Sequence, residues 1–253
     1  MCFFKVIVPN YNSEKWINKC IDSILDQSFT DFEVVITDDM STDNSLELIK
    51  QYTDKRIHLI PLQTKRYNGG SRNVAIDFPM DSKYTLFIDS DDWFTRNDIF
   101  QIIHDTIVNN NYPDCVSLSY SCKIGNNVSD VELIRNTPEE MVKSLFVACW
   151  TKCIKSELMV HFPENTLMED VSQHIEQIDK VETFASVSTP VLIWNRTNEN
   201  SCSLNPSPKR KSSEFRQIAD LMDLVLVHDY CEEHRQWRIN CMKDTIFNGG
   251  HLW

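Results

Sequence analysis

The sequence predicts an α/β protein with a central, mostly parallel sheet. Two observations support this prediction. Short apolar runs alternate with amphipathic segments through the first half of the chain, which is typical of right-handed strand–helix–strand units. The apolar runs are also uninterrupted, as in FFKVIV and FEVVIT, and such runs are expected for strands that helices cover on both faces.

The elements of this half follow one another in a regular order. The first predicted helix carries apolar residues at positions i, i+1, i+4 and i+5, so that they share one face, and Ser13 is its expected N-cap. Strands are expected at 3–8, 32–37, 57–60 and 84–88, and helices at 14–27, 43–52, 71–78 and 98–109.

The order of elements changes after Cys115. No linker, repeat or low-complexity segment interrupts the chain, so one domain is expected over residues 1–253, with subregions at 1–115, 116–205 and 206–253. The later elements are a strand at 115–121, helices that open at Thr137 and near Glu169, strands at 183–187 and 191–194, and a helical tail from about residue 212.

Charge and glycine content exclude several classes of protein. The chain has 25 Lys and Arg residues against 37 Asp and Glu residues, a net charge of −12. This charge excludes a nucleic-acid footprint over the whole surface, although residues 209–216 form a local basic strip. Only 5 residues are Gly, and neither GxGxxG nor GxxxxGK[ST] occurs. A nucleotide would therefore be bound without a glycine-rich phosphate loop.

The cysteines and the apolar segments indicate the cellular compartment in which the protein is expected. There are 9 cysteines, an odd number without a CxxC pair, which favours free thiols in a reducing compartment. The N-terminus does not read as a signal peptide, and no apolar window approaches the ~18 residues of a membrane span. We therefore expect a cytoplasmic protein. A peripheral position at a membrane face and the oligomeric state stay open.

Acidic and polar residues follow three of the predicted strands. They lie in the runs PNYN at 9–12, DDMSTD at 38–43 and DSDD at 89–92. The carboxyl ends of parallel strands lie at one edge of a sheet, where α/β proteins bind ligands. Helix capping explains Asp43 and Asp98 but not three acids in four residues at 89–92. Crowded carboxylates favour a bound cation, and their hard oxygens select Mg²⁺ or Mn²⁺.

Four longer strings carry a resemblance to a known family. They are VIVPNYN at 6–12, DQSFTDFEVVITDDMSTDNS at 26–45, GGSRNVAID at 69–77 and FIDSDDWF at 87–94, with weaker matches at CWTKC and MED. In this order and spacing the chain resembles a family 2 glycosyltransferase of the glycosyltransferase A-type fold, over roughly residues 3–200. Met40 departs from the family, which commonly has glycine there. A third metal ligand, such as a late histidine, is not evident.

The resemblance implies a role for each site residue. Asp91 is the expected direct ligand of Mn²⁺ or Mg²⁺, with Asp89 as its partner. Asp170 matches the catalytic base, beside Glu169. Asp39 is favoured for the imide N–H of uracil and Tyr11 for the face of the base. The full set for the nucleotide-sugar is Pro9, Tyr11, Asn12, Asp38, Asp39, Arg72, Asp89, Ser90 and Arg196, and the acceptor candidates are Trp150, Lys152 and Asp92.

The implied function is an inverting, metal-dependent transfer of a sugar from a nucleotide-diphospho-sugar, with UDP favoured, to a hydroxyl of a glycan or a lipid-linked saccharide. Residues 1–115 would bind the donor, and residues 116–205 the acceptor and the base. Transfer to a modified base in DNA is an alternative that the 209–216 strip keeps open. A nucleotidyltransferase lacks support because PNYNSEKW is not glycine-rich. Intact Asp91 and Asp170 argue against a non-catalytic binding module.

Overall fold

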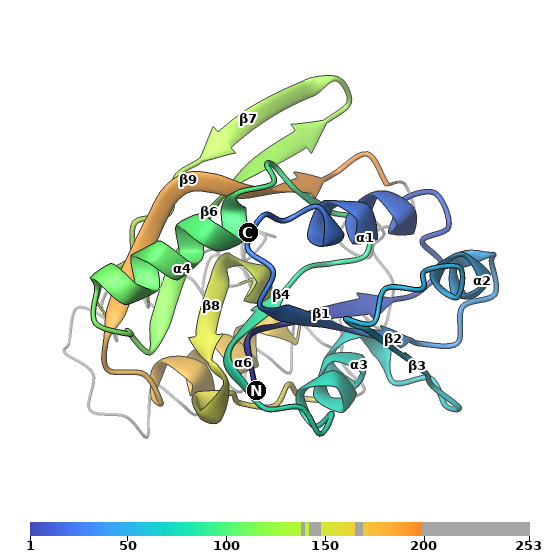
Figure 1. The fold of residues 1–253 in the computed structure, drawn as a ribbon, viewed down its shortest axis with the longest axis horizontal. Coiled ribbons are helices and arrows are strands. Elements are labelled where there is room, and N and C mark those ends of the chain that lie inside the picture. The colour runs from blue at the N-terminus through green and yellow to red at the C-terminus, as the bar shows by residue number, and fades with distance from the viewer. Residues whose placement is uncertain (138–139, 142–147, 165–168, 199–253) are drawn as a thin grey trace, which may run out of the picture.

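The computed structural model describes residues 1–137, 140–141, 148–164 and 169–198, and it places their strands in one mixed sheet (Figure 1). The order is β3-β2-β1-β4-β8-β6-β9-β5, and β7 pairs with β6. The first four strands run parallel, as predicted, and each strand begins and ends within about two residues of the expected bounds. They are β1 (Cys2–Asn10), β2 (Phe32–Asp38), β3 (Ile57–Pro61) and β4 (Ser82–Phe87).

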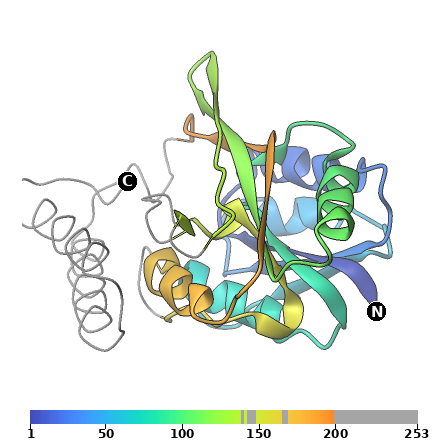
Figure 2. The same ribbon diagram turned by 90° about the vertical axis from the view of Figure 1, so that its left-hand side faces the viewer.

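The other half of the sheet is mixed. Strand β8 (Lys152–Lys155) runs antiparallel between β4 and β6 (Cys115–Ile124). Strand β9 (Phe184–Asn195) is one continuous strand rather than the predicted two, and it pairs with β6 through a register shift between Leu118 and Tyr120. The short strands β5 (Trp93–Phe94), β7 (Asn127–Val131) and β8 were not predicted. Strands β6 and β7 form a hairpin that projects from the body (Figure 2).

Helices cover both faces of the sheet. Helices α1 (Ile17–Leu25) and α4 (Ile99–Asn109) lie on one face, and α3 (Tyr67–Ile76) and α6 (Asp170–Ile178) lie on the other (Figures 1 and 2). Helix α2 (Ser45–Ile49) lies at the end of the sheet near β3. Two short 3₁₀ turns, Cys149–Thr151 and Ser156–Leu158, flank β8. The predicted tail from residue 212 and the 209–216 strip lie outside the described residues.

The prediction for the start of the first helix is wrong. Helix α1 begins at Ile17, and the Ser13 hydroxyl donates to Asn10 instead of capping it. The backbone carbonyl of Ser13 accepts from the N–H groups of Trp16 and Ile17, which forms a turn ahead of the helix. The predicted apolar face is confirmed, because Ile17, Cys20, Ile21 and Ile24 are buried.

The order of the strands along the sheet reverses between β1 and β4. Strands β1, β2 and β3 proceed outward on one side of β1, and the chain then returns to β4 on its other side. In α/β proteins, ligands bind outside the carboxyl ends of the strands at such a reversal of strand order. Asn10 ends β1, and Asp89 follows β4 by two residues. The fold therefore brings the PNYN and DSDD runs to this point.

The backbone conformation at Met40 explains why the family commonly has glycine at this position. Met40 has φ of 61°, in the left-handed region, and its side chain is exposed. A residue with a Cβ is strained there, whereas glycine is not. We expect Met40→Gly to raise the free energy of unfolding by about 1 kcal/mol, measured by urea denaturation. Met40→Ala keeps the Cβ and should bring no gain, so equal stability of the two variants would contradict this account.

Two further features concern location and thiols. In the part of the chain that the structure describes, no helix has the length and apolar character needed to cross a membrane. Six cysteines fall among the described residues, and all six are free, as predicted.

Candidate functional site

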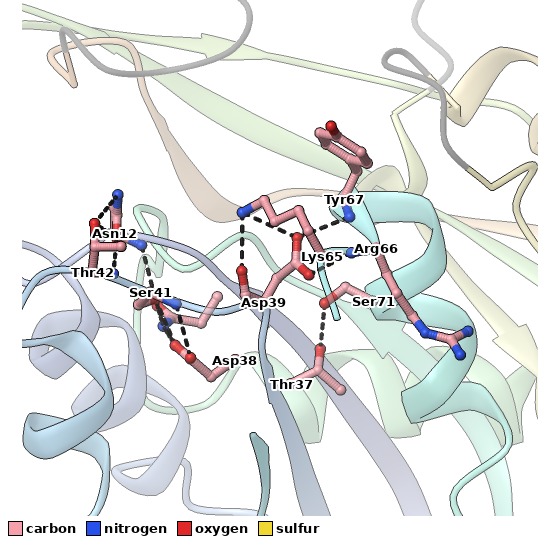
Figure 3. Close-up of polar contacts among 11 residues, drawn as sticks. Asn12, Thr37, Asp38, Asp39, Ser41, Thr42, Lys65, Arg66, Tyr67 and Ser71 are labelled. Carbon is pink, nitrogen blue, oxygen red and sulfur yellow. Dashed lines mark hydrogen bonds and ion pairs between the residues drawn. The ribbon is translucent and has the colours of Figure 1, made fainter. Parts of the chain in front are cut away.

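The loops after β1 and β2 are joined by side-chain hydrogen bonds (Figure 3). Asn12, at a positive φ of 50°, donates its backbone N–H to Ser41 Oγ at 3.0 Å. Its side-chain oxygen accepts from the backbone N–H of Thr42 at 2.7 Å. Asn12 therefore holds the two loops together, and its predicted role in donor binding stays a prediction.

Asp38 is turned into the same loop. It is buried, and its carboxylate accepts from Asn10 Nδ2 and Ser41 Oγ, each at 2.6 Å, and from the Ser41 backbone N–H at 3.1 Å. A buried carboxylate needs such donors. Asp38 thus shapes the loop that carries Asp39.

Asp39 lies at the start of α3. Its Oδ1 accepts from the backbone N–H of Arg66 at 2.7 Å, and its Oδ2 accepts from that of Tyr67 at 2.8 Å (Figure 3). These are N–H groups at the helix N-terminus, where a carboxylate is stabilising. Lys65 Nζ lies 3.2 Å from Asp39 Oδ2 and 2.7 Å from the centre of the Tyr11 ring. The two residues predicted to bind the base therefore share a lysine.

Arg72 connects three carboxylates from separate parts of the chain. Its side chain is 1% exposed. Nη2 donates to Asp89 Oδ1 at 2.8 Å, and Nη1 donates to Glu169 Oε1 and lies 3.5 Å from Asp170 Oδ1. The guanidinium thus joins the loop after β4 to the start of α6. The sequence predicted Arg72 near the donor, and the structure adds its contacts with the predicted base.

The GGSRN segment of α3 explains how this arrangement is held. A Cβ on Gly69 would lie 2.6 Å from the backbone oxygen of Pro163, so glycine lets α3 approach the segment that leads to α6. Asn73 exchanges two hydrogen bonds with the backbone of Phe162, at 2.9 and 2.8 Å. The motif therefore positions Arg72 against Glu169.

The carboxyls of this cluster differ in environment. Burial raises the pKa of Glu169 to about 7, although the Arg72 charge opposes the shift. Burial likewise raises the pKa of Asp89, against the pull of Arg72. The side chain of Glu169 is 4% exposed and that of Asp170 is 21% exposed. Asp170 is therefore the member of the pair that is open to a substrate.

The residues after Asp89 contact the loop that follows β9. Asp91 Oδ2 accepts from Asn198 Nδ2 at 2.8 Å, and Asp91 O accepts from Asn195 Nδ2 at 3.1 Å. Asp92 is buried, and its Oδ1 accepts from the Asn195 backbone N–H at 2.7 Å. Burial and the charges of Asp91 and Asp89 raise the pKa of Asp92 well above its usual range. Asp92 thus joins the loop after β4 to the end of β9, and Ser90 in the same loop is buried.

Asp89 and Asp91 fit a divalent cation by their chemistry. Burial, with a contribution from Asp89, raises the pKa of Asp91 to about 6, so a cation would offset the cost of charging both groups. Within the described ranges no group of three or more His, Cys, Asp and Glu side chains could hold a metal. Mg²⁺ is commonly held by one or two carboxylates together with water and substrate phosphates. Asp89 and Asp91 would therefore be enough to hold such a cation from the protein side.

The remaining predicted residues lie near β6, β8 and β9. Trp150 is buried against the rings of Tyr120 and Trp194. Lys152 is buried, and its Nζ lies 3.0 Å from both Ala148 O and His174 Nδ1. Burial lowers the pKa of Lys152 to about 8. Contact of these two residues with an acceptor stays a prediction.

Two other residues predicted to bind the nucleotide-sugar, Arg196 and Pro9, lie beside or within strands of the sheet. The Arg196 guanidinium lies 4.9 Å from the centre of the Trp194 ring. Pro9 is buried within β1. Three residues that contact predicted site residues were not predicted from the sequence: Lys65, Asn195 and Asn198. Lys65 precedes a predicted helix, and no pattern in the neighbouring sequence predicts the contact of its side chain with Asp39.

Comparisons with known proteins identify the family of the chain. The family model described as Glycosyl transferase family 2 matches residues 5–145. The poly(ribitol-phosphate) beta-N-acetylglucosaminyltransferase TarS of Staphylococcus aureus is 30% identical over 176 residues, which is 65% of this chain and 30% of TarS. The glucosyltransferase WfgD of Escherichia coli, whose name specifies UDP-Glc and an α-D-GlcNAc-diphosphoundecaprenol, is 26% identical over 160 residues, 62% of each protein. The matched part of the chain thus spans less than a third of TarS.

Solved structures share the fold. S. aureus TarS 1–349 with UDP-GlcNAc superposes with a TM-score of 0.79 at 23% identity, covering 97% of this chain and 73% of that one. The mannosyltransferase PcManGT of Pyrobaculum calidifontis with GDP-Man and Mn²⁺ gives 0.63 at 14% identity, covering 98% and 88%. The expected glycosyltransferase A-type fold is confirmed by the first of these. Because this family model matches more than half of its residues, the chain belongs to glycosyl transferase family 2.

Proposed function

We propose that the protein is an inverting, metal-dependent glycosyltransferase that moves a sugar from a UDP-sugar to a hydroxyl of a glycan or lipid-linked saccharide. The contact of Arg72 with both Asp89 and the Glu169–Asp170 pair carries this proposal, because it joins the donor loop and the base. UDP-GlcNAc in the TarS structure and UDP-Glc in the name of WfgD support the choice of donor. Residues 1–115 would bind it, and residues 116–205 the acceptor.

Asp170 acts as the general base in this proposal. The acceptor hydroxyl must lose a proton as it attacks the anomeric carbon, and one carboxylate near it suffices. Asp170 is the more exposed of the pair and is held by Arg72 Nη1 at 3.5 Å. Glu169 is enclosed and bonded to the same guanidinium. Attack opposite the departing diphosphate inverts the configuration of the anomeric carbon.

Asp91 and Asp89 would hold Mn²⁺ or Mg²⁺, which supplies Lewis-acid stabilisation of the charge on the leaving diphosphate. Asn198 holds one oxygen of Asp91 and so limits its rotation. Tyr11 is exposed and offers its ring to the base, and Asp39 retains lone pairs beyond those used by Arg66 and Tyr67. A cytoplasmic location is part of this proposal. Transfer to DNA depends on the 209–216 strip, outside the described residues.

Calorimetry with UDP, GDP and CMP in the presence of Mn²⁺ tests the donor. We expect UDP to bind most tightly and Asp39→Ala to weaken UDP by roughly 10-fold, since a hydrogen bond to a charged group is lost. The variant should also melt earlier, because Asp39 caps α3 at two N–H groups. Binding of GDP or CMP more tightly than UDP would overturn the choice of uridine. Release of UDP from UDP-sugars, with the product anomer assigned by NMR, tests the transfer itself.

A further inference from the structure

Lys65 lies between the two residues that are proposed to bind the base. Its Nζ is 3.2 Å from Asp39 Oδ2 and donates to the Asp39 carbonyl at 2.9 Å (Figure 3). The same Nζ lies 2.7 Å from the centre of the Tyr11 ring. An ammonium over a tyrosine face is attracted by the ring. Lys65 therefore contacts both the Tyr11 ring, on which a base would stack, and the Asp39 carboxylate, which would accept a hydrogen bond from the base.

Asp39 keeps its position without Lys65. Each carboxylate oxygen accepts one backbone N–H at the start of α3, from Arg66 and from Tyr67. The Lys65 side chain is 31% exposed and has a flexible stem, whereas the Asp39 side chain is 5% exposed. Lys65 Nζ can therefore move to the edge of the Tyr11 ring while Asp39 stays fixed. A base that stacks on Tyr11 then meets an acceptor, Asp39, beside a donor, Lys65.

That pair matches one edge of uracil. Uracil presents a donor at N3–H and an acceptor at O4, next to each other and away from the ribose. A lysine ammonium has three donors and cannot accept. Cytosine, in the same position, would turn its N4 amino group toward Lys65 and its N3 lone pair toward Asp39, so both contacts would be repulsive. Sites that bind through buried polar pairs discriminate strongly between such bases.

We propose that Lys65 is a specificity residue that donates to O4 of the uracil base while Asp39 accepts from N3–H. The inference rests on the proposed function, because it concerns the donor of that reaction. It adds to the base pocket a residue that selects uridine over cytidine nucleotides.

Binding of UDP and CDP to four forms of the protein tests the proposal by calorimetry with Mn²⁺. The forms are the wild type, Lys65→Met, Lys65→Arg and Lys50→Met, the last a control on an exposed lysine paired with Glu47. We expect Lys65→Met to weaken UDP by roughly 10- to 100-fold, the usual value of a charged hydrogen bond. CDP should bind equally or more tightly, because a repelling donor is gone. Lys65→Arg should keep the preference for UDP, and Lys50→Met should match the wild type.

Thio analogues identify the atom that is read. Sulfur accepts hydrogen bonds weakly, so 4-thio-UDP should bind the wild type more weakly than UDP, and Lys65→Met should bind both alike. In the wild type 2-thio-UDP should behave as UDP. An unchanged UDP to CDP ratio in Lys65→Met, with an unchanged melting temperature, would overturn the role of Lys65 and leave the proposed function intact. A wild type that binds no uridine nucleotide would overturn both.

Discussion

Replacement of Asp170 by asparagine should lower kcat by roughly 10²–10⁴-fold, the usual contribution of general-base catalysis. Asparagine keeps the size and the contact with Arg72 but cannot take the acceptor proton. The interaction develops in the transition state, so UDP affinity should change little. Steady-state kinetics together with calorimetry on the same preparation measure both quantities.

Glu169→Gln is the matched control for that variant. Glu169 is 4% exposed and its bond to Arg72 can be kept by a glutamine oxygen, so its effect on kcat should be milder. Asp170 is 21% exposed and is therefore the more accessible carboxylate of the two. If Asp170→Asn melts earlier yet turns over normally, Asp170 is a residue of the helix start and the base lies elsewhere.

Replacement of Asp91 by asparagine should abolish transfer while the fold survives. Excess chelator should have the same effect on the wild type, because both remove the cation from the diphosphate. Asp105→Asn, on an exposed face of α4, is the control and should leave activity unchanged. Full turnover of the wild type in chelator would contradict the requirement for metal.

We expect Asp91→Asn to change the pH dependence of stability as well as the activity. The pKa of Asp91 is raised to about 6 in the folded protein, above its usual value of 3.8. A raised folded pKa means that stability is lost as the pH rises through the folded value. In the absence of metal, Asp91→Asn should therefore melt at or above the wild-type temperature at pH 7.5, and the difference should shrink toward pH 4. Mn²⁺ should raise the melting temperature of the wild type more than that of the variant.

The sequence by itself determined the parallel half of the sheet and the position of the acidic loops. Uninterrupted apolar runs indicate buried strands from local sequence alone. A residue that directly follows such a strand lies beyond the carboxyl end of the strand, where the sheet binds ligands. That reasoning placed Asp39 and Asp89 correctly in the fold. It missed β7 and β8, because four or five residues with lysine, asparagine and serine carry no clear strand pattern. Their strand conformation comes from pairing with β6 and β4.

Only the tertiary structure decided what each polar side chain touches. Arg72 meets Glu169 across 97 residues of sequence, and Asn198 meets Asp91 across 107. Asp39 meets Lys65 because α3 begins beside the loop after β2. Local periodicity specifies which face of an element is apolar, but the direction of a charged side chain depends on the packing of elements that are distant in sequence. The position of the acidic loops in the fold was therefore predictable, and the contacts of their side chains were not.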